Sequence, residues 1–254
     1  MLRTFLAAVV VLGCASALGA QDVVKPRPSS GKGGMAGTFP NEKIEAAGKT
    51  REYRLVVPKS VDPAKPAPVV FAFHGFLIDS KDVMPVYSQL DKLAEKEGFI
   101  LAYLNAVNKA WPLIVDWAKD DLAFFDALAA HIAGKHNVDL NRVYLAGMSN
   151  GAYFCHVVAS QRSDKVAAIA CHSGGLGFLA LGDPKVKNKY AVIAIHGDKD
   201  AIVKVDESRK VRDAYQKWGH PVEYVEVPNW NHLWAGNINV NDKIWKFFEA
   251  HPLK

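Results

Sequence analysis

The sequence lacks several features that mark specialised classes of protein. None of its apolar runs reaches about 18 uninterrupted residues, which excludes a bundle of membrane-spanning helices. Its 13 Pro and 19 Gly are ordinary usage for 254 residues, which excludes collagen-like and low-complexity architectures. The net charge of +5 comes from scattered basic residues, so no basic stripe predicts a nucleic-acid partner.

Cysteine is scarce, with three residues, and no group of Cys and His has the spacing of metal ligands. Cys171 with His172, and His196 with Asp198, do not match patterns such as C-x-x-C or H-E-x-x-H, so we predict no metal site. Cys155 and Cys171 fit a disulfide or two buried thiols equally, because a sequence does not give their separation.

The first 37 residues have the composition of an export signal and a linker. Residues 1–20 contain a basic start, an apolar run and then small residues, the layout of a secretory signal peptide. The run Val-Leu-Gly-Cys ending at Cys14 also resembles a lipoprotein box, in which Cys14 would be lipidated. Residues 21–37 are rich in Pro, Gly, Ser and Lys, which predicts a flexible linker. We therefore expect a secreted or periplasmic protein that is either free or, if Cys14 is lipidated, attached to a membrane through this lipid alone.

Residues 38–254 alternate between strand-like and helix-like segments, without a repeat or a second linker. Such alternation predicts a single three-layer α/β domain with a mostly parallel central sheet. An antiparallel pair opens the domain, and Asp120 and Asp206 are expected as helix N-caps. The predicted strands are 43–46, 51–58, 69–73, 99–104, 142–146, 166–170, 190–195 and 222–227, and the predicted helices are 85–96, 120–135, 150–161, 206–218 and 241–250.

Ser149 is the candidate nucleophile. It is the centre of Gly147-Met148-Ser149-Asn150-Gly151, a G-x-S-x-G pattern between a predicted strand and a predicted helix. The two glycines allow a sharp turn that exposes the Ser hydroxyl. The pentapeptide alone is a weak signal, and the strand–turn–helix context makes it specific.

A Ser hydroxyl needs a base, and the position of each histidine relative to the sheet selects one. His220 precedes the strand 222–227 and so lies at the opposite edge, and His251 follows the last helix. His232 directly follows that strand, on the edge where Ser149 is expected. We therefore predict His232 as the base.

An acid must orient the base, and the loop after strand 190–195 offers Asp198 and Asp200, with Asp183 a more remote third. Backbone N–H groups must also hold the developing oxyanion. One is expected from Asn150, and another from the loop His74-Gly75-Phe76 after strand 69–73, under which the His74 ring is expected to pack.

These residues carry a resemblance to a known group. The segments FAFHGF, DDLAFFDAL, VDLNRVYLAGMSNGAY, IHGDKDAIV and PNWNHLW, within residues 49–252, resemble exported esterases of carbohydrate esterase family 1: polyhydroxybutyrate-depolymerase-like, feruloyl and acetylxylan esterases. The resemblance implies an α/β-hydrolase without a cofactor. It implies Ser149, Asp200 and His232 as catalytic residues and Phe76 and Asn150 as oxyanion donors. Asp198 stands where the family often has Thr.

Four tryptophans fall in loops at the predicted catalytic edge: Trp111, Trp117, Trp230 and Trp234. They are candidates for stacking on sugar rings or aromatic acyl groups, and packing of the loops is the alternative. Asp120 and Asp121 together could suggest an acid pair, but their place at a helix start favours capping.

We interpret the sequence as an exported serine esterase acting through an acyl-enzyme. Expected substrates are feruloyl or acetyl esters of plant polysaccharide, or short polyester oligomers. The alternatives are a surface-tethered binding protein on a hydrolase scaffold, which would not need the Ser–Asp–His set, and a peptidase of the same fold. The sequence shows no sign of the propeller-like domain expected for such a peptidase, and no pattern in it sets the oligomeric state.

Overall fold

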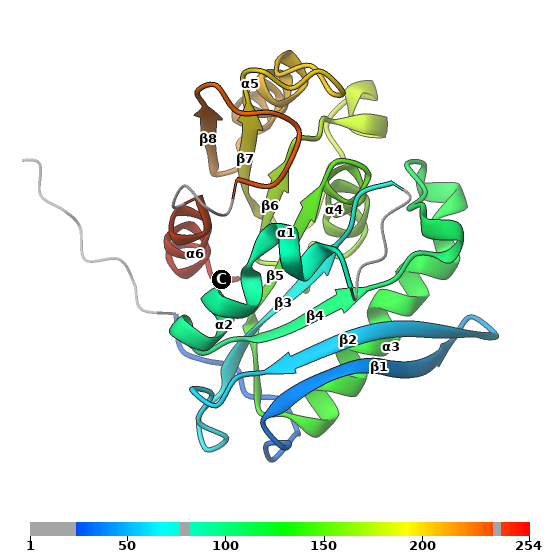
Figure 1. Ribbon diagram of the computed structural model, residues 1–254, viewed down its shortest axis with the longest axis vertical. Helices are drawn as coiled ribbons and strands as arrows, with labels where there is room; N and C mark the ends of the chain where they lie inside the picture. The colour runs from blue at the N-terminus through cyan, green and yellow to red at the C-terminus, as the bar shows by residue number, and fades with distance from the viewer. Residues whose placement is uncertain (1–23, 77–81, 236–239) are drawn as a thin grey trace, which may run out of the picture.

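A central sheet of eight strands organises the computed structural model, which describes residues 24–76, 82–235 and 240–254. The strand order is β1-β2-β4-β3-β5-β6-β7-β8 (Figure 1). The strands are β1 (Gly37–Ala46), β2 (Lys49–Val57), β3 (Ala67–Phe73), β4 (Ile100–Leu104), β5 (Val138–Met148), β6 (Ala168–His172), β7 (Ala191–Gly197) and β8 (Val222–Val227).

The pairing of the strands follows their apolar pattern. β1 and β2 form an antiparallel pair, β2 pairs antiparallel with β4, and every other neighbouring pair is parallel. All residues of β3, β4, β6 and β7 are buried, because these strands have a helical layer on both faces. The predicted opening hairpin and mostly parallel sheet are confirmed.

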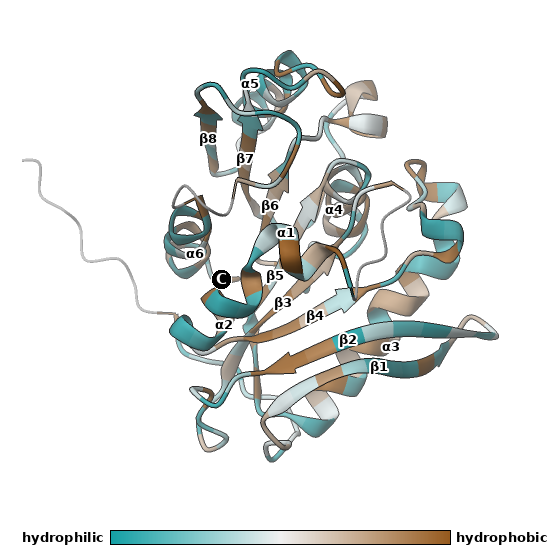
Figure 2. Ribbon diagram, viewed as in Figure 1, coloured by the Kyte–Doolittle hydropathy of each residue, from teal (hydrophilic) through white to brown (hydrophobic). Residues whose placement is uncertain are grey.

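Helices cover both faces of this sheet. α3 (Lys119–Lys135), α4 (Asn150–Gln161) and α5 (Asp206–Lys217) contribute to the core on one face, and α2 (Leu90–Glu97) and α6 (Val240–Ala250) to the core on the other. Figure 2 shows the apolar central strands between helices with polar outer faces. The remaining short helices are α1 (Met84–Ser88), η1 (Val107–Lys109), η2 (Val115–Trp117) and η3 (Gly177–Leu181).

Several local predictions were wrong. The single helix expected over residues 85–96 is split into α1 and α2 at Gln89, whose φ of 52° is left-handed. Asp120 and Asp206 are not N-caps. Each lies in the first helical turn, where its charge favours the positive end of the helix dipole. Asp121 does not cap either, and pairs with the buried Arg51 at 2.7 Å.

The expected flexible linker is also wrong for its described part. The backbone N–H of Ser29 donates to the carbonyl of Val138, and that of Leu140 donates to the carbonyl of Arg27. Asp139 accepts from the Arg27 amide at 2.8 Å. Residues 27–29 therefore run antiparallel to the first residues of β5. They lie at the opposite end of this strand from Ser149. Among the described residues, no helix has the length and apolarity needed to cross a membrane.

Candidate active site

Ser149 occupies a strained turn where β5 ends and α4 begins. Its φ of 53° and ψ of −120° are a conformation that non-glycine residues seldom adopt. The turn is held from both sides, because the Ser149 N–H donates to the His172 carbonyl at 2.8 Å and the Ser149 carbonyl accepts from Ala152 at 2.9 Å. The predicted strand–turn–helix context of Ser149 is therefore present.

The two glycines of the pentapeptide are required by backbone packing. A Cβ on Gly147 would overlap the carbonyl of Gly151, and a Cβ on Gly151 would overlap the carbonyl oxygens of Phe73 and His74. The start of α4 thus lies directly against the end of β3. This close approach brings the loop after β3 next to Ser149.

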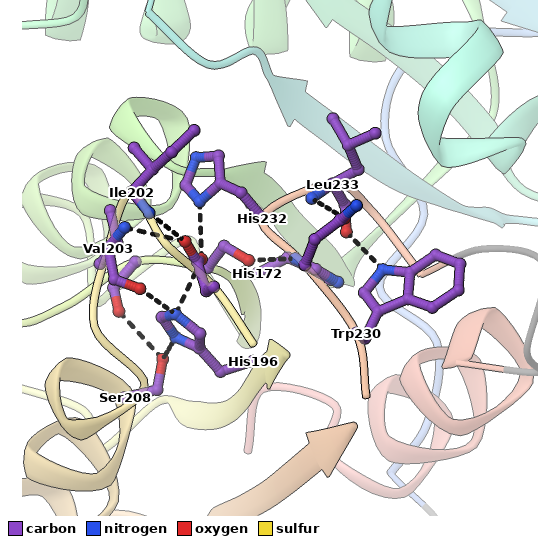
Figure 3. A network of polar contacts seen from close by, with 12 residues as sticks. His172, His196, Ile202, Val203, Ser208, Trp230, His232 and Leu233 are labelled. Carbon is purple, nitrogen blue, oxygen red and sulfur yellow. Dashed lines mark hydrogen bonds and ion pairs between the residues drawn. The ribbon is translucent and has the colours of Figure 1, made fainter. Parts of the chain in front are cut away.

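His232 and Asp200 meet at the same edge of the sheet. His232 lies in the loop after β8, Asp200 lies in the loop after β7, and Nδ1 of His232 donates to Oδ2 of Asp200 at 2.7 Å (Figure 3). The His232 side chain is 12% exposed, whereas that of Asp200 is fully buried. The pair therefore presents one imidazole edge toward solvent and keeps its carboxylate away from water.

Backbone amides hold the other oxygen of Asp200. Oδ1 accepts from the N–H of Ile202 at 2.8 Å and of Val203 at 2.9 Å. Burial raises the pKa of Asp200, but the hydrogen bonds from His232, Val203 and Ile202 outweigh burial and hold it below the usual carboxyl range. Asp200 is therefore ionised at neutral pH.

The two alternative acids lie in other surroundings. The backbone of Asp198 pairs with Val227, and its Oδ1 is buried without a hydrogen-bond partner among the described residues. Asp183 accepts from the backbone of Lys185 and forms an ion pair with Lys189. Within the described chain, the carboxylate that contacts His232 is that of Asp200.

Ser149 and His232 are brought to one edge but are not hydrogen-bonded to each other in the described structure. Ser149 directly follows β5, His172 ends the adjacent β6, and His232 follows β8. The nucleophile–base contact is often loose in a site without substrate and tightens in the reacting complex.

The two predicted oxyanion donors also lie at this edge. Phe76 follows β3, with a 58% exposed side chain, and Asn150 is the first residue of α4. The Asn150 side chain accepts from the Trp111 N–H at 2.7 Å and donates to the Trp111 carbonyl at 3.0 Å. This two-point contact ties the loop after β4 to the residue that follows Ser149.

His74 does more than pack beneath its loop. Its Nε2 accepts from the Ala106 N–H at 3.0 Å, so Nδ1 carries the hydrogen and donates to the Gly75 carbonyl at 2.7 Å. The C=O and N–H of one peptide unit point in opposite directions. Holding the Gly75 carbonyl against His74 therefore turns the N–H of Phe76 away from the ring.

The four tryptophans divide by exposure. Trp117 is 74% exposed, and Trp230 is half-buried with its Nε1–H donating to the Leu233 carbonyl. Trp111 and Trp234 are buried at 2% and 3% exposure, so the prediction that they contact substrate is wrong. Trp111 stacks on Phe154 in the core, where an indole contributes more by packing than by facing water.

Two buried histidines at the site were missed as site residues. Nε2 of His172 accepts from the Ala235 N–H at 3.1 Å, which anchors the loop that carries His232. Burial, with His196 and His232 nearby, lowers the pKa of His172 to about 3, so its ring is neutral. His196 lies 3.0 Å from Asp200. The position of His196 at a strand end, just before Gly197, was the feature of the sequence that could have indicated a site residue.

The two cysteines within the described residues do not form a disulfide. Cys155 and Cys171 are both free and buried, and the Cys171 thiol donates to the Ala152 carbonyl. Of the two alternatives, buried thiols are therefore what the structure contains. The described residues contain no cluster of His, Cys, Asp and Glu that could hold a metal ion.

The three-layer architecture, with a strained Ser after the fifth strand and an Asp–His pair after the seventh and eighth, is that of the α/β-hydrolase fold. The solved acetyl xylan esterase of Aspergillus awamori superposes with a TM-score of 0.68 at 12% identity, covering 82% of this chain and 98% of that one. This likeness confirms the predicted fold.

Sequence comparison goes further than the fold. The family described as Esterase PHB depolymerase matches residues 52–213, and the chain belongs to this family. Feruloyl esterase D of Neurospora crassa is 27% identical over 79% of this chain and 70% of that protein. Feruloyl esterase C of Emericella nidulans is 25% identical over 79% of this chain and 84% of that protein. The predicted resemblance, and with it the class of carboxylic-ester hydrolase, is confirmed.

Proposed function

We propose that the protein is an exported serine esterase in which Ser149 is the nucleophile, His232 the base and Asp200 the acid. The observation that carries the proposal is the 2.7 Å contact between His232 and Asp200 at the sheet edge where the strained Ser149 turn lies. The chain order Ser, Asp, His is the order of α/β-hydrolases.

The reaction proceeds through an acyl-enzyme. Oγ of Ser149 attacks the ester carbonyl carbon while Nε2 of His232 takes its proton, and Asp200 stabilises the imidazolium. His232 then gives this proton to the leaving alcohol as the C–O bond breaks. Water attacks the acyl-enzyme with His232 again as base, which releases the acid and regenerates Ser149.

The backbone amides of Phe76 and Asn150 hold the oxyanion of each tetrahedral intermediate. Three contacts support this role. Gly151 lies against the carbonyls at the end of β3, His74 turns the Phe76 amide away from its ring, and the Asn150 side chain holds the loop at Trp111. Losing one such donor costs roughly 3–4 kcal/mol of transition-state stabilisation.

The substrate we propose is a feruloyl or acetyl ester of plant polysaccharide, or a short polyester oligomer. The description of the family and the names of the relatives support it. The catalytic edge also carries exposed apolar side chains from five different loops, which suits an apolar acyl group. They are Phe76, Val107, Leu113, Ile114, Trp117, Leu181, Ile202 and Leu233. Trp117 and Trp230 remain the candidate stacking residues.

Export is part of the proposal and rests on residues 1–20 alone, which lie outside the described residues, as does Cys14. We propose a secreted or periplasmic location, with lipidation of Cys14 as the form of any membrane contact. The protein is recovered from a host that processes such signals, and mass spectrometry of its N-terminus shows whether the signal has been removed and whether Cys14 carries a lipid.

A substrate panel tests the catalytic proposal. Wild type and Ser149→Ala are each assayed for hydrolysis of nitrophenyl acetate, nitrophenyl butyrate, methyl ferulate, acetylated xylan and a hydroxybutyrate oligomer. The matched control is Ser160→Ala, in the same helix with its hydroxyl on the Val157 carbonyl. We expect turnover to vanish in Ser149→Ala only, and a fluorophosphonate to label Ser149. A fully active Ser149→Ala protein would show that the proposed nucleophile is wrong.

A further inference from the structure

Asp200 contacts two histidines rather than one. Nε2 of His196 lies 3.0 Å from Oδ2 of Asp200, the same oxygen that accepts from His232 (Figure 3). His196 is in β7, and its side chain is completely buried, as is that of Asp200. The carboxylate thus accepts hydrogen bonds from three N–H groups, that of His232 on Oδ2 and those of Ile202 and Val203 on Oδ1, and the His196 ring lies against Oδ2.

The surroundings of the ring decide where its hydrogen lies. Nε2 of His196 faces Oδ2 of Asp200 and, at 2.9 Å, the carbonyl of Val203. A carbonyl oxygen only accepts, so Nε2 carries a hydrogen and donates it to Val203, whose own N–H donates to Oδ1 of Asp200. Nδ1 accepts from the Ser208 hydroxyl at 2.6 Å, and Oγ of Ser208 lies 2.9 Å from the Gly174 carbonyl. Both edges of the ring are therefore fixed.

We propose that His196 is a positioning residue for ester hydrolysis, which fixes Asp200 through its hydrogen bond to the Val203 carbonyl and through the contact of its ring with Oδ2. The inference rests on the proposed function, since it gives His196 a role only if Asp200 and His232 act together on Ser149. A carboxylate held at both oxygens does not rotate, which keeps His232 in the tautomer that can take a proton. The polar N–H of His196, with its nitrogen 3.0 Å from Oδ2, also weakens the hold of Asp200 on the His232 imidazolium.

Other ionisable groups surround this pair. His172 reaches it from β6, and Tyr153 faces Asp200 from α4. Glu207 precedes Ser208 on α5, with its carboxylate beside Gly175. The neutral ring of His172 adds no charge in the range where an esterase is assayed. A change in the pH profile on replacing His196 is therefore measured against a constant background.

A matched pair of amide variants separates the two edges of the ring. The amide nitrogen of His196→Gln reaches the position of Nε2 and can still donate to the Val203 carbonyl beside Asp200. The amide of His196→Asn reaches only the Nδ1 position, so it keeps the contact with Ser208 and loses both the donor to Val203 and the contact with Oδ2. His220→Asn is the control for losing a buried imidazole, because His220 lies before β8 and hydrogen-bonds to the Tyr190 carbonyl.

We expect His196→Asn to lower kcat by about tenfold or more with KM changed less than about twofold, since Val203 and the carboxylate that it holds are no longer fixed. Its half-maximal kcat/KM should move to higher pH by about half a unit, because the polar N–H beside Oδ2 is lost. His196→Gln should restore most of the activity and the wild-type profile. His220→Asn should change thermal stability without altering the profile.

The outcomes separate the role of His196 from the proposed function. Equal losses in His196→Asn and His196→Gln, or a His196→Asn profile identical to wild type, would overturn the inference while Ser149-dependent turnover still stands. Absence of Ser149-dependent turnover in wild type would instead overturn the proposed function. If His196→Asn does not fold, ¹⁵N NMR of histidine-labelled wild type at neutral pH decides, with His196→Gln identifying the signals: a protonated Nε2 on His196 supports the inference, and a bare Nε2 refutes it.

Discussion

Replacing Asp200 by Asn changes charge and hydrogen-bonding direction at the centre of the site. The wild-type carboxylate only accepts, and the N–H groups of His232, Ile202 and Val203 all point at it. An amide has one acceptor and one donor end. If its oxygen faces Ile202 and Val203, its NH₂ faces Nδ1 of His232, which must then give up its hydrogen and accept. The hydrogen moves to Nε2, where the proton of Ser149 should arrive.

The size of this effect follows from the tautomer. A histidine protonated on Nε2 cannot act as a base toward Ser149. Catalysis is therefore limited to the fraction of molecules in which the amide oxygen, and not the NH₂ group, faces His232. The analogous Asp→Asn change in a serine protease triad lowers kcat by about 10⁴. We expect a fall of roughly 10³ to 10⁴ for Asp200→Asn, which corresponds to about 4–5.5 kcal/mol of transition-state stabilisation.

Initial rates of nitrophenyl acetate hydrolysis between pH 6 and 10, with thermal unfolding of each variant, measure this effect. Asp198→Asn is the matched control, because Asp198 lies two residues away and contacts Val227 through its backbone. We expect Asp198→Asn to stay within about threefold of wild type, since no reacting group touches its side chain. A folded Asp200→Asn protein within tenfold of wild type, or an inactive Asp198→Asn protein, would refute the reasoning.

Three further predictions concern stability and substrate binding. Because the pKa of His172 is lowered to about 3, the folded protein binds no proton there, and the free energy of unfolding should fall by about 1.4 kcal/mol per pH unit from pH 6.5 down toward 3. In His172→Gln, the free energy of unfolding measured with urea should change less with pH over that range. Gly151→Ala should destabilise the protein by more than about 3 kcal/mol through backbone overlap, whereas Gly134→Ala, on α3 with open space, should stabilise it by about 0.5–1 kcal/mol in the same assay. Trp117→Ala should raise KM for methyl ferulate without a shift in Tm, and Trp111→Ala should cost about 3–5 kcal/mol of stability; unchanged KM in Trp117→Ala would remove Trp117 as a substrate contact.

Much of the fold could be predicted because the composition of the strands indicates that they are buried. β3, β4, β6 and β7 are short apolar runs, and only a strand covered on both faces tolerates that composition. Boundaries were less certain. The break at Gln89 arises from a single left-handed residue, and the attachment of residues 27–29 to β5 arises from backbone hydrogen bonds that leave little trace in composition.

Ser149 and His232 could be assigned as candidates because their places depend on order along the chain. Each directly follows a strand, and the carboxyl ends of parallel strands share one edge of the sheet. Asp198 and Asp200 both satisfy that rule, so position alone left them open. The two differ in which side chain turns inward, and the contact between Asp200 and His232 is the observation that favours Asp200 in our proposal.

The sequence by itself therefore determined the class of fold, the catalytic edge and the residue types found there, since these follow from local periodicity and strand order. Only the tertiary structure decided which side chains meet. It buried Trp111 and Trp234, placed the Arg51 guanidinium on Asp121, and set His196 beside Asp200. These pairings join residues from different elements, and their distances depend on how helices and loops pack against the sheet, which no short segment of sequence specifies.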